Sequence, residues 1–187
     1  MAEVKGNIVT ASLSGQVAKL LVFRQKDGKT IVGKYPYRSG KISAKQQAHL
    51  DRFALGAVYA KNAMLNPTLK DSYAAEAAKR RGVTPYNLAM ADYLKAPVVY
   101  RVNASGYSGA TSGEKIYAEV ADTFKVVSVR VKIVKANSSL VEEGAAAFSN
   151  GKWEYTTTAL NANKTGGKVI VTASDRAGNE THYELDI

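Results

Sequence analysis

The run VVSVRVKIVK at residues 126–135 sets the architecture of the second half of the chain. From Val127 onward, apolar and polar side chains alternate, which is the period of a β-strand with one face buried. Similar short segments, separated by turns rich in Gly, Asn, Ser and Asp, occur at residues 98–102, 115–120, 140–143, 152–158, 168–173 and 181–186. Seven short strands in about 90 residues predict an all-β sandwich over residues 98–187.

The C-terminal end of this region carries a distinctive turn sequence. Residues 171–179 read VTASDRAGN, and an alternating strand follows them. This sequence resembles the last hairpin of bacterial immunoglobulin-like modules. The resemblance implies an immunoglobulin-like sandwich that needs no disulfide, with Trp153 as its core aromatic residue. Such modules act as spacers or adhesive units in surface and virion proteins, and the fold alone identifies no partner.

The first half of the chain contains a strong hairpin signal. Residues 20–35 read LLVFRQKDGKTIVGKY, and the central Asp-Gly pair favours a type I′ turn between two strands. This turn places Phe23 opposite Val32 and Arg24 opposite Ile31. Both faces of the predicted ribbon therefore carry apolar and basic side chains.

A two-stranded hairpin is only marginally stable in water by itself. We therefore expect this hairpin to lie on helices, to join a larger sheet, or to pair with another chain. The preceding residues 8–15, IVTASLSG, are expected to supply a third strand or an arm that docks on a neighbour.

Three helices follow the hairpin. Each begins at a recognisable signal: a capping box formed by Ser43 and Gln46, then Asn-Pro and Thr-Pro pairs at residues 66–67 and 84–85. Helical spacing of apolar residues predicts helices from Ser43 to about Leu65, from Pro67 to Gly82, and from Pro85 to about Lys95. Pro97 ends the last one.

The order of these elements, ending in YNLAMADYL at residues 86–94, resembles a set of uncharacterised bacterial and phage proteins over residues 13–98. This resemblance supports the architecture and implies no activity. The predicted fold is an α+β N-terminal unit, a β-hairpin plus three short helices, followed by an all-β immunoglobulin-like sandwich. The predicted domains are residues 1–97 and 98–187.

The net positive charge of the chain comes entirely from its first half. The net charge is +10, and residues 1–100 hold 16 Lys and Arg against 6 Asp and Glu, whereas residues 101–187 hold 10 of each. An uneven distribution of this kind indicates that one unit faces an anionic partner, although a solvated basic face explains it equally well.

Basic and aromatic residues are interleaved around the second strand of the hairpin. Such a pattern can contact phosphates and stack on bases, and it can equally dock on an acidic protein surface. The alternative reading is that Pro36 ends the strand while the tyrosines pack on the helices. The candidate interaction surface comprises Arg24, Lys26, Lys29, Lys34, Tyr35, Tyr37, Arg38 and Lys41.

The sequence contains no recognisable catalytic, cofactor or metal site. It has no cysteine, and His49 and His182 stand far apart without metal-ligand spacing. The glycine-rich loop at residues 106–115 lacks the spacing of a phosphate-binding loop. We therefore predict no catalytic residue, no cofactor, no small-molecule substrate and no enzymatic activity.

Two acidic motifs also have structural explanations. Asp175 and Asn179 offer two oxygen ligands where Ca²⁺ takes 6 to 8, so a turn held by the Asp175 side chain is expected. Glu142 and Glu143 adjoin one another in a strand, and they are expected to point to opposite faces at a solvated strand end.

The leading hypothesis is a non-enzymatic structural or assembly protein, such as a virion component or filament subunit. Its basic N-terminal unit would bind another copy or an acidic protein, and its sandwich would project outward. The alternative is a nucleic-acid-binding protein that uses the basic hairpin. No secretory signal or membrane span is recognised, so we expect cytoplasmic synthesis, with a virion or an assembled extracellular structure as the destination.

Overall fold

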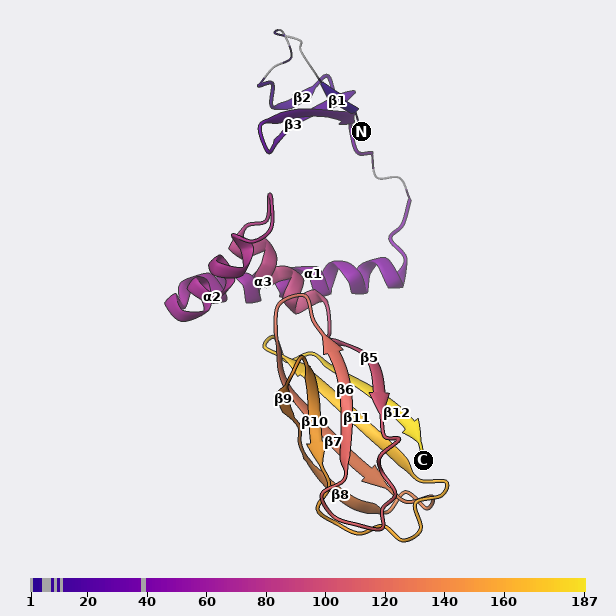
Figure 1. Ribbon diagram of the computed structural model, residues 1–187. Coiled ribbons are helices and arrows are strands. Elements are labelled where there is room, and N and C mark those ends of the chain that lie inside the picture. The colour runs from indigo at the N-terminus through magenta and orange to yellow at the C-terminus, as the bar shows by residue number, and fades with distance from the viewer. Residues whose placement is uncertain (1, 5–7, 9, 11, 38–39) are drawn as a thin grey trace.

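The chain forms three helices and three antiparallel sheets and is therefore a mixed α+β protein (Figure 1). The computed structural model describes residues 2–4, 8, 10, 12–37 and 40–187. A small sheet comes first, the three helices follow, and the last two sheets contain the C-terminal half (Figure 1). No helix in these residues is both long and apolar enough to cross a membrane.

The hairpin is confirmed as the centre of the small sheet. Strand β3 (Leu21–Lys26) pairs with β4 (Lys29–Lys34), with Phe23 opposite Val32 as the turn predicts. Asp27 and Gly28 both have positive φ angles, of 51° and 74°. That conformation defines the type I′ turn and favours glycine at its second position.

The remaining strands of this sheet differ from the expectation. Residues 8–15 are expected to supply a third strand or a docking arm, but the third strand, β2 (Gly15–Val17), begins only at the end of that segment and pairs with β3. Residue 8 and residues 10 and 12 lie in turns, while residues 9 and 11 fall outside the described residues. A further strand, β1 (Ala2–Val4), pairs with β4 and completes the order β1-β4-β3-β2.

The three helices occupy the predicted positions. They are α1 (Ala44–Leu65), α2 (Pro67–Ala77) and α3 (Pro85–Leu94). Each is capped as the sequence indicates, by Ser43 with the reciprocal Gln46 bond, by Asn66 and by Thr84. The second helix stops at Ala77 instead of Gly82, because the chain tightens there into short turns.

All seven strands predicted in the C-terminal half are present, together with one short strand that was not predicted. Two four-stranded sheets lie face to face, with the orders β5-β6-β10-β9 and β12-β11-β7-β8 (Figure 1). Their strands are β5 (Val98–Asn103), β6 (Lys115–Ala121), β7 (Val126–Val134), β8 (Leu140–Ala145), β9 (Ala147–Ser149), β10 (Lys152–Thr156), β11 (Lys168–Asp175) and β12 (Glu180–Asp186).

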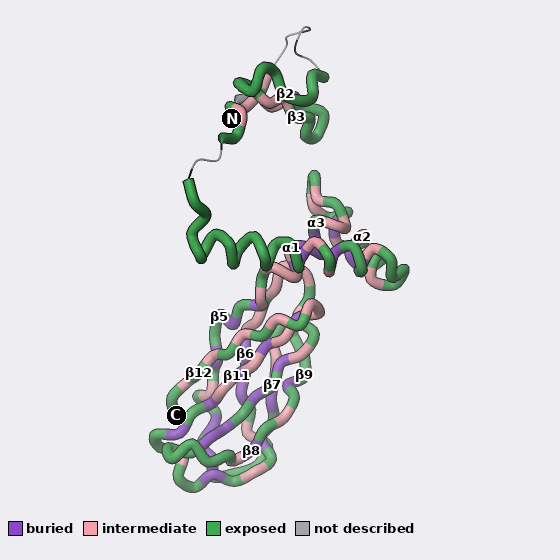
Figure 2. The backbone as a smooth tube through the Cα atoms, turned by 180° about the vertical axis from the view of Figure 1, so that it is seen from behind, coloured by how far each residue is buried: buried purple, intermediate pink, exposed green. Residues whose placement is uncertain are grey.

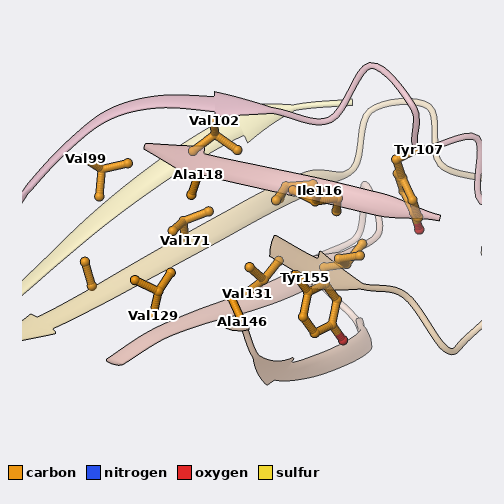
Figure 3. Close-up of a cluster of buried hydrophobic side chains, with 13 residues drawn as sticks. Val99, Val102, Tyr107, Ile116, Ala118, Val129, Val131, Ala146, Tyr155 and Val171 are labelled. Atoms are coloured by element: carbon orange, nitrogen blue, oxygen red, sulfur yellow. The ribbon is translucent and has the colours of Figure 1, made fainter. Parts of the chain in front are cut away.

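A hydrophobic cluster fills the space between these two sheets (Figure 3). The alternation in β7 explains its composition, since Val129, Val131 and Ile133 point inward. Trp153 is expected to be the core aromatic residue but is only partly buried at the margin. Its partner across the strands is Phe148 of the short edge strand β9, and the two ring centres lie 5.4 Å apart. Because β9 is a short edge strand, part of the Trp153 ring stays uncovered.

A second cluster joins the three helices. Tyr73 and Leu88 are fully buried in it among small alanines, which lets the helices approach closely. Phe124, from the loop after β6, also packs here, and its ring centre lies 4.3 Å from that of Tyr73. The helices are therefore attached to one end of the β-sheets by a direct hydrophobic contact.

A pair of substitutions on β7 tests this arrangement. Ile133→Ala is expected to lower the free energy of unfolding by about 2–5 kcal/mol, because it leaves a cavity between the sheets. Val127→Ala, on the same strand but half exposed, is the control and is expected to have little effect. Urea unfolding followed by circular dichroism measures both, and equal losses would contradict the proposed facing of β7.

Candidate interaction surface and carboxylate cluster

The predicted basic surface begins on one face of the small sheet. Arg24, Lys26 and Lys29 are exposed, and the register places their side chains on the same side of the ribbon. Lys29 forms an ion pair with Glu3 of β1, with Nζ 3.3 Å from the carboxylate. Lys34 pairs with Leu21, so by the same alternation it belongs to the opposite face.

The other predicted residues follow the hairpin along the chain. Tyr35 is partly buried, Tyr37 is exposed, and Arg38 lies outside the described residues. Lys41 lines a hollow at the start of α1, beside His49. Of the seven candidate residues that the structure describes, it thus gathers three on one face and places Lys34 on the opposite face and Tyr35, Tyr37 and Lys41 in the segment that leads into α1.

The described residues that precede Gly56 form no hydrophobic core of their own. Among them only Thr30 is buried. All residues of α1 from 44 to 55 are exposed, so the first half of this long helix has no packing partner (Figure 2). Helices and sheets are normally stabilised by burying one apolar face, whereas the apolar side chains described in this region, such as Phe23 and Val32, are at most partly buried.

Exposed apolar side chains concentrate in the same region. Of 18 large apolar residues that are exposed in the described part of the chain, 11 precede residue 60. Four of these, Leu50, Phe53, Leu55 and Val58, lie on α1. Exposed apolar surface marks interaction sites in soluble proteins where such side chains gather into a patch.

A different candidate site lies where the helices meet the β-sheets. Asp92 of α3, Asp122 of the β6–β7 loop and Asp175 at the end of β11 each point one carboxylate oxygen toward a common centre. These three oxygens lie within 4.8 Å of one another. The three residues are 30 or more positions apart in sequence, so tertiary packing alone brings them together.

Asp92 is fully buried in this cluster. The Tyr73 hydroxyl donates a hydrogen bond of 2.6 Å to Asp92 Oδ2, and the Tyr59 hydroxyl lies 3.0 Å from that of Tyr73. Burial raises the pKa of Asp92 to about 7, because a charged carboxylate is poorly solvated there; the Tyr73 bond lowers this pKa, and neighbouring Asp122 and Asp175 raise it. Burial likewise raises the pKa of Tyr73.

The other two carboxylates are held by their own loops. Asp122 Oδ2 accepts hydrogen bonds from the backbone N–H groups of Phe124 and Lys125, at 3.2 and 3.1 Å. Asp175 accepts from the backbone N–H and the side-chain amide of Asn179, at 2.8 and 2.7 Å. The turn held by the Asp175 side chain is therefore confirmed, and the same turn contributes a carboxylate to the cluster.

The Asn179 amide also reaches the end of α3. Its Nδ2 donates to the backbone carbonyls of Asp92 and Tyr93, at 3.0 and 3.2 Å. These carbonyls belong to the last turn of the helix, where intrahelical partners run out. The turn after β11 thus caps α3 and positions Asp92 at the same time.

No sequence motif joins the three aspartates of this cluster. One local signal was present: Asp92 lies three and four positions after Ala89 and Leu88, so it shares the apolar face of α3. A carboxylate on such a face must find a polar partner or change its protonation state. Its partners Asp122 and Asp175 could not be assigned without the tertiary structure.

A second buried carboxylate corrects another expectation. Glu142 and Glu143 do point to opposite faces, and exposed Glu143 pairs with Arg130. Glu142, however, is not at a solvated strand end. Its Oε2 accepts bonds from the Tyr155 hydroxyl and from both the backbone N–H and hydroxyl of Thr158, which together tie the loop after β10 to β8.

Both histidines lie on the surface. His49 is exposed on α1, and His182 is exposed on β12, where its Nδ1 lies 2.9 Å from the Thr172 hydroxyl. The glycine-rich segment connects β5 to β6 and is organised by Glu114, which accepts bonds from Ser108 and Gly109.

Comparison with protein-family models, curated proteins and solved structures found no match to this chain.

The protonation of Asp92 predicts an unusual pH dependence of stability. Because its pKa is near 7 in the folded chain and near 3.8 normally, the folded form retains a proton that the unfolded chain loses between these values. In a buffer with a chelator, the contribution of Asp92 to the free energy of unfolding should therefore fall as the pH rises from about 4 to 7.

Urea unfolding of the wild type and Asp92→Asn at pH 4.5, 6.0 and 7.5 measures this contribution. The stability of the wild type relative to the variant should decrease with pH, because asparagine does not titrate. Asp71→Asn, an exposed substitution on α2, serves as the control and should follow the wild type. Parallel pH profiles for the wild type and Asp92→Asn would contradict the assigned protonation.

Proposed function

We propose that this protein is a non-enzymatic assembly protein that associates with other copies of itself through its N-terminal unit and displays an immunoglobulin-like unit. The observation that carries the proposal is the absence of buried apolar side chains among the described residues before Gly56. A virion component or a filament subunit would use both halves in this way.

The energetic argument starts from the cost of ordering a chain. Fixing each residue costs about 1–2 kcal/mol of backbone entropy, and burial of apolar surface must offset it. The small sheet and the first half of α1 are ordered elements without that burial in a single chain. Packing against another molecule would supply it.

A second copy is the occupant that the surface of α1 fits best. The exposed pair Leu50 and Phe53 follows the i, i+3 spacing of one helix face, and Leu55 and Val58 add an exposed pair with the same spacing farther round the helix. Two such faces are self-complementary when related by a two-fold axis. The three-residue edge strands β1 and β2 offer further backbone groups for pairing between copies.

The C-terminal half supports a display or spacer role. Its two sheets enclose a complete core, so it needs no partner to be stable. The predicted immunoglobulin-like relationship agrees with its count of short antiparallel strands and with the turn at Asp175. A C-terminal half with its own core, joined to an N-terminal region whose described residues form none, suits a subunit that assembles through its N-terminal end.

Light scattering coupled to size-exclusion chromatography tests the proposal. The wild type should elute with a mass that is a multiple of 20.0 kDa, in both low and high salt, because the contact is apolar. Leu50→Asp with Phe53→Asp should give a folded species of 20.0 kDa. Leu160→Asp, at a more exposed site in the C-terminal half, should leave the assembly intact. A wild-type monomer at high concentration would refute self-association.

Nucleic-acid binding is the second candidate function, and the shared face of Arg24, Lys26 and Lys29 supports it. A two-stranded ribbon can enter the major groove of duplex DNA. Affinity would then fall steeply with salt, because binding displaces counterions from the phosphates.

Fluorescence anisotropy with labelled duplex and single-stranded DNA at two salt concentrations measures this activity. Arg24→Ala with Lys26→Ala and Lys29→Ala should remove any binding. A matched triple substitution of exposed lysines in the C-terminal half, Lys132, Lys152 and Lys168, should retain it. Equal binding by both triple variants would exclude the hairpin face as the nucleic-acid surface.

A further inference from the structure

The carboxylate cluster at Asp92, Asp122 and Asp175 forms no ion pair within the described part of the chain. The Arg80 guanidinium instead donates to the carbonyl of Thr123, next to Asp122, at 2.7 Å. Among the described residues, none of the ion pairs formed by lysine or arginine involves these three aspartates. Asp92 is fully buried, and Asp175 is buried as well. Burying several unpaired carboxylates is strongly unfavourable, so the cluster requires a cation or bound protons.

Two of the carboxylate oxygens have no hydrogen-bond donor. Asp92 Oδ1 and Asp122 Oδ1 are buried atoms that receive no donor from any other described side chain or backbone group, although the second oxygen of each residue is bonded. The two carboxyl groups can bond to one another only when one of them carries a proton. Buried polar atoms in folded proteins are nearly always satisfied. An unpartnered oxygen on a fully buried side chain within an acidic cluster therefore points to a positively charged ligand.

The composition and size of the cluster select the kind of ligand. All nearby donors are oxygens, which hard divalent cations prefer. Ca²⁺ binds oxygen at about 2.3–2.6 Å, so two ligands on opposite sides of the ion are about 4.6–5.2 Å apart. The three carboxylate oxygens lie within 4.8 Å of one another, a spread that the Ca²⁺ sphere spans. Mg²⁺ keeps several waters and usually takes only one or two carboxylates, so three carboxylates from three segments favour the larger ion.

We propose that Asp92, Asp122 and Asp175 form a Ca²⁺ site that fastens the helices to the β-sheets. The three ligands come from α3, the β6–β7 loop and the end of β11, and water would complete the coordination. Ion binding would release the proton held by Asp92 and would stiffen the junction. All three residues lie outside the N-terminal region that is proposed to self-associate, so the two proposals stand or fall independently.

The experiment uses the full chain after removal of metal ions with a chelator. Adding CaCl₂ at pH 7.5 should raise the thermal midpoint by roughly 5–10 °C when Ca²⁺ reaches about 100 times its dissociation constant. Isothermal titration calorimetry should give one site per chain. Tb³⁺, a luminescent Ca²⁺ substitute, should be sensitised by tyrosine excitation, because Tyr73 is bonded to Asp92.

Matched variants assign the effect to the cluster. Asp122→Asn keeps an oxygen that can accept the Phe124 and Lys125 bonds but removes the charge, and it should abolish the midpoint shift and the Tb³⁺ signal. Asp71→Asn, exposed on α2, should retain both. Circular dichroism without added metal checks that each variant is folded.

Several outcomes would overturn the proposal. A wild-type chain that shows neither a midpoint shift nor calorimetric heat with Ca²⁺ would refute it without recourse to any variant. A greater response to Mg²⁺ than to Ca²⁺ would refute the choice of ion. Absence of any metal effect, together with an Asp92→Asn variant that is more stable than the wild type at pH 7.5, would show that shared protons neutralise the cluster.

Discussion

The contact between the Asn179 side chain and the end of α3 determines how the halves of this protein are joined. Its amide donates to Asp175 within its own turn and to the carbonyls of Asp92 and Tyr93 on the helix. Because the turn is fixed by β11 and β12, the helix end is fixed with it. The burial of Asp92 and the packing of Phe124 on Tyr73 follow from this placement.

The joined region and the N-terminal region differ in the interactions that stabilise them. Two hydrophobic clusters and a network of side-chain hydrogen bonds stabilise the chain from Gly56 onward. Before that residue, stability within one chain depends on backbone pairing in the small sheet and on the helical hydrogen bonds of α1. The basic residues of the candidate interaction surface belong to this N-terminal region. A partner that binds there would cover exposed apolar side chains and would also contact positively charged ones.

Local chemistry made most of the secondary structure predictable. Asp27-Gly28, Ser43 with Gln46, and the alternation around Val131 each act within a few residues, so the sequence alone indicated the hairpin, the helix starts and the strands. Elements defined by distant partners were missed. Strand β1 pairs with β4, with Ala2 opposite Val32, and the burial of Glu142 depends on Thr158 in a loop 16 positions away. The Asp92 cluster likewise exists only after three distant segments have packed.

The two candidate sites suggest complementary demands on one molecule. A subunit that assembles through its N-terminal end transmits force or orientation to the displayed unit only when the connection between them is stiff. The Asp92, Asp122 and Asp175 carboxylates lie at that connection, where repulsion among them would loosen it and a bound cation would tighten it. An uncompensated cluster of this kind weakens the fold, whereas an ion-filled one makes the stiffness of the junction depend on the surrounding Ca²⁺ concentration.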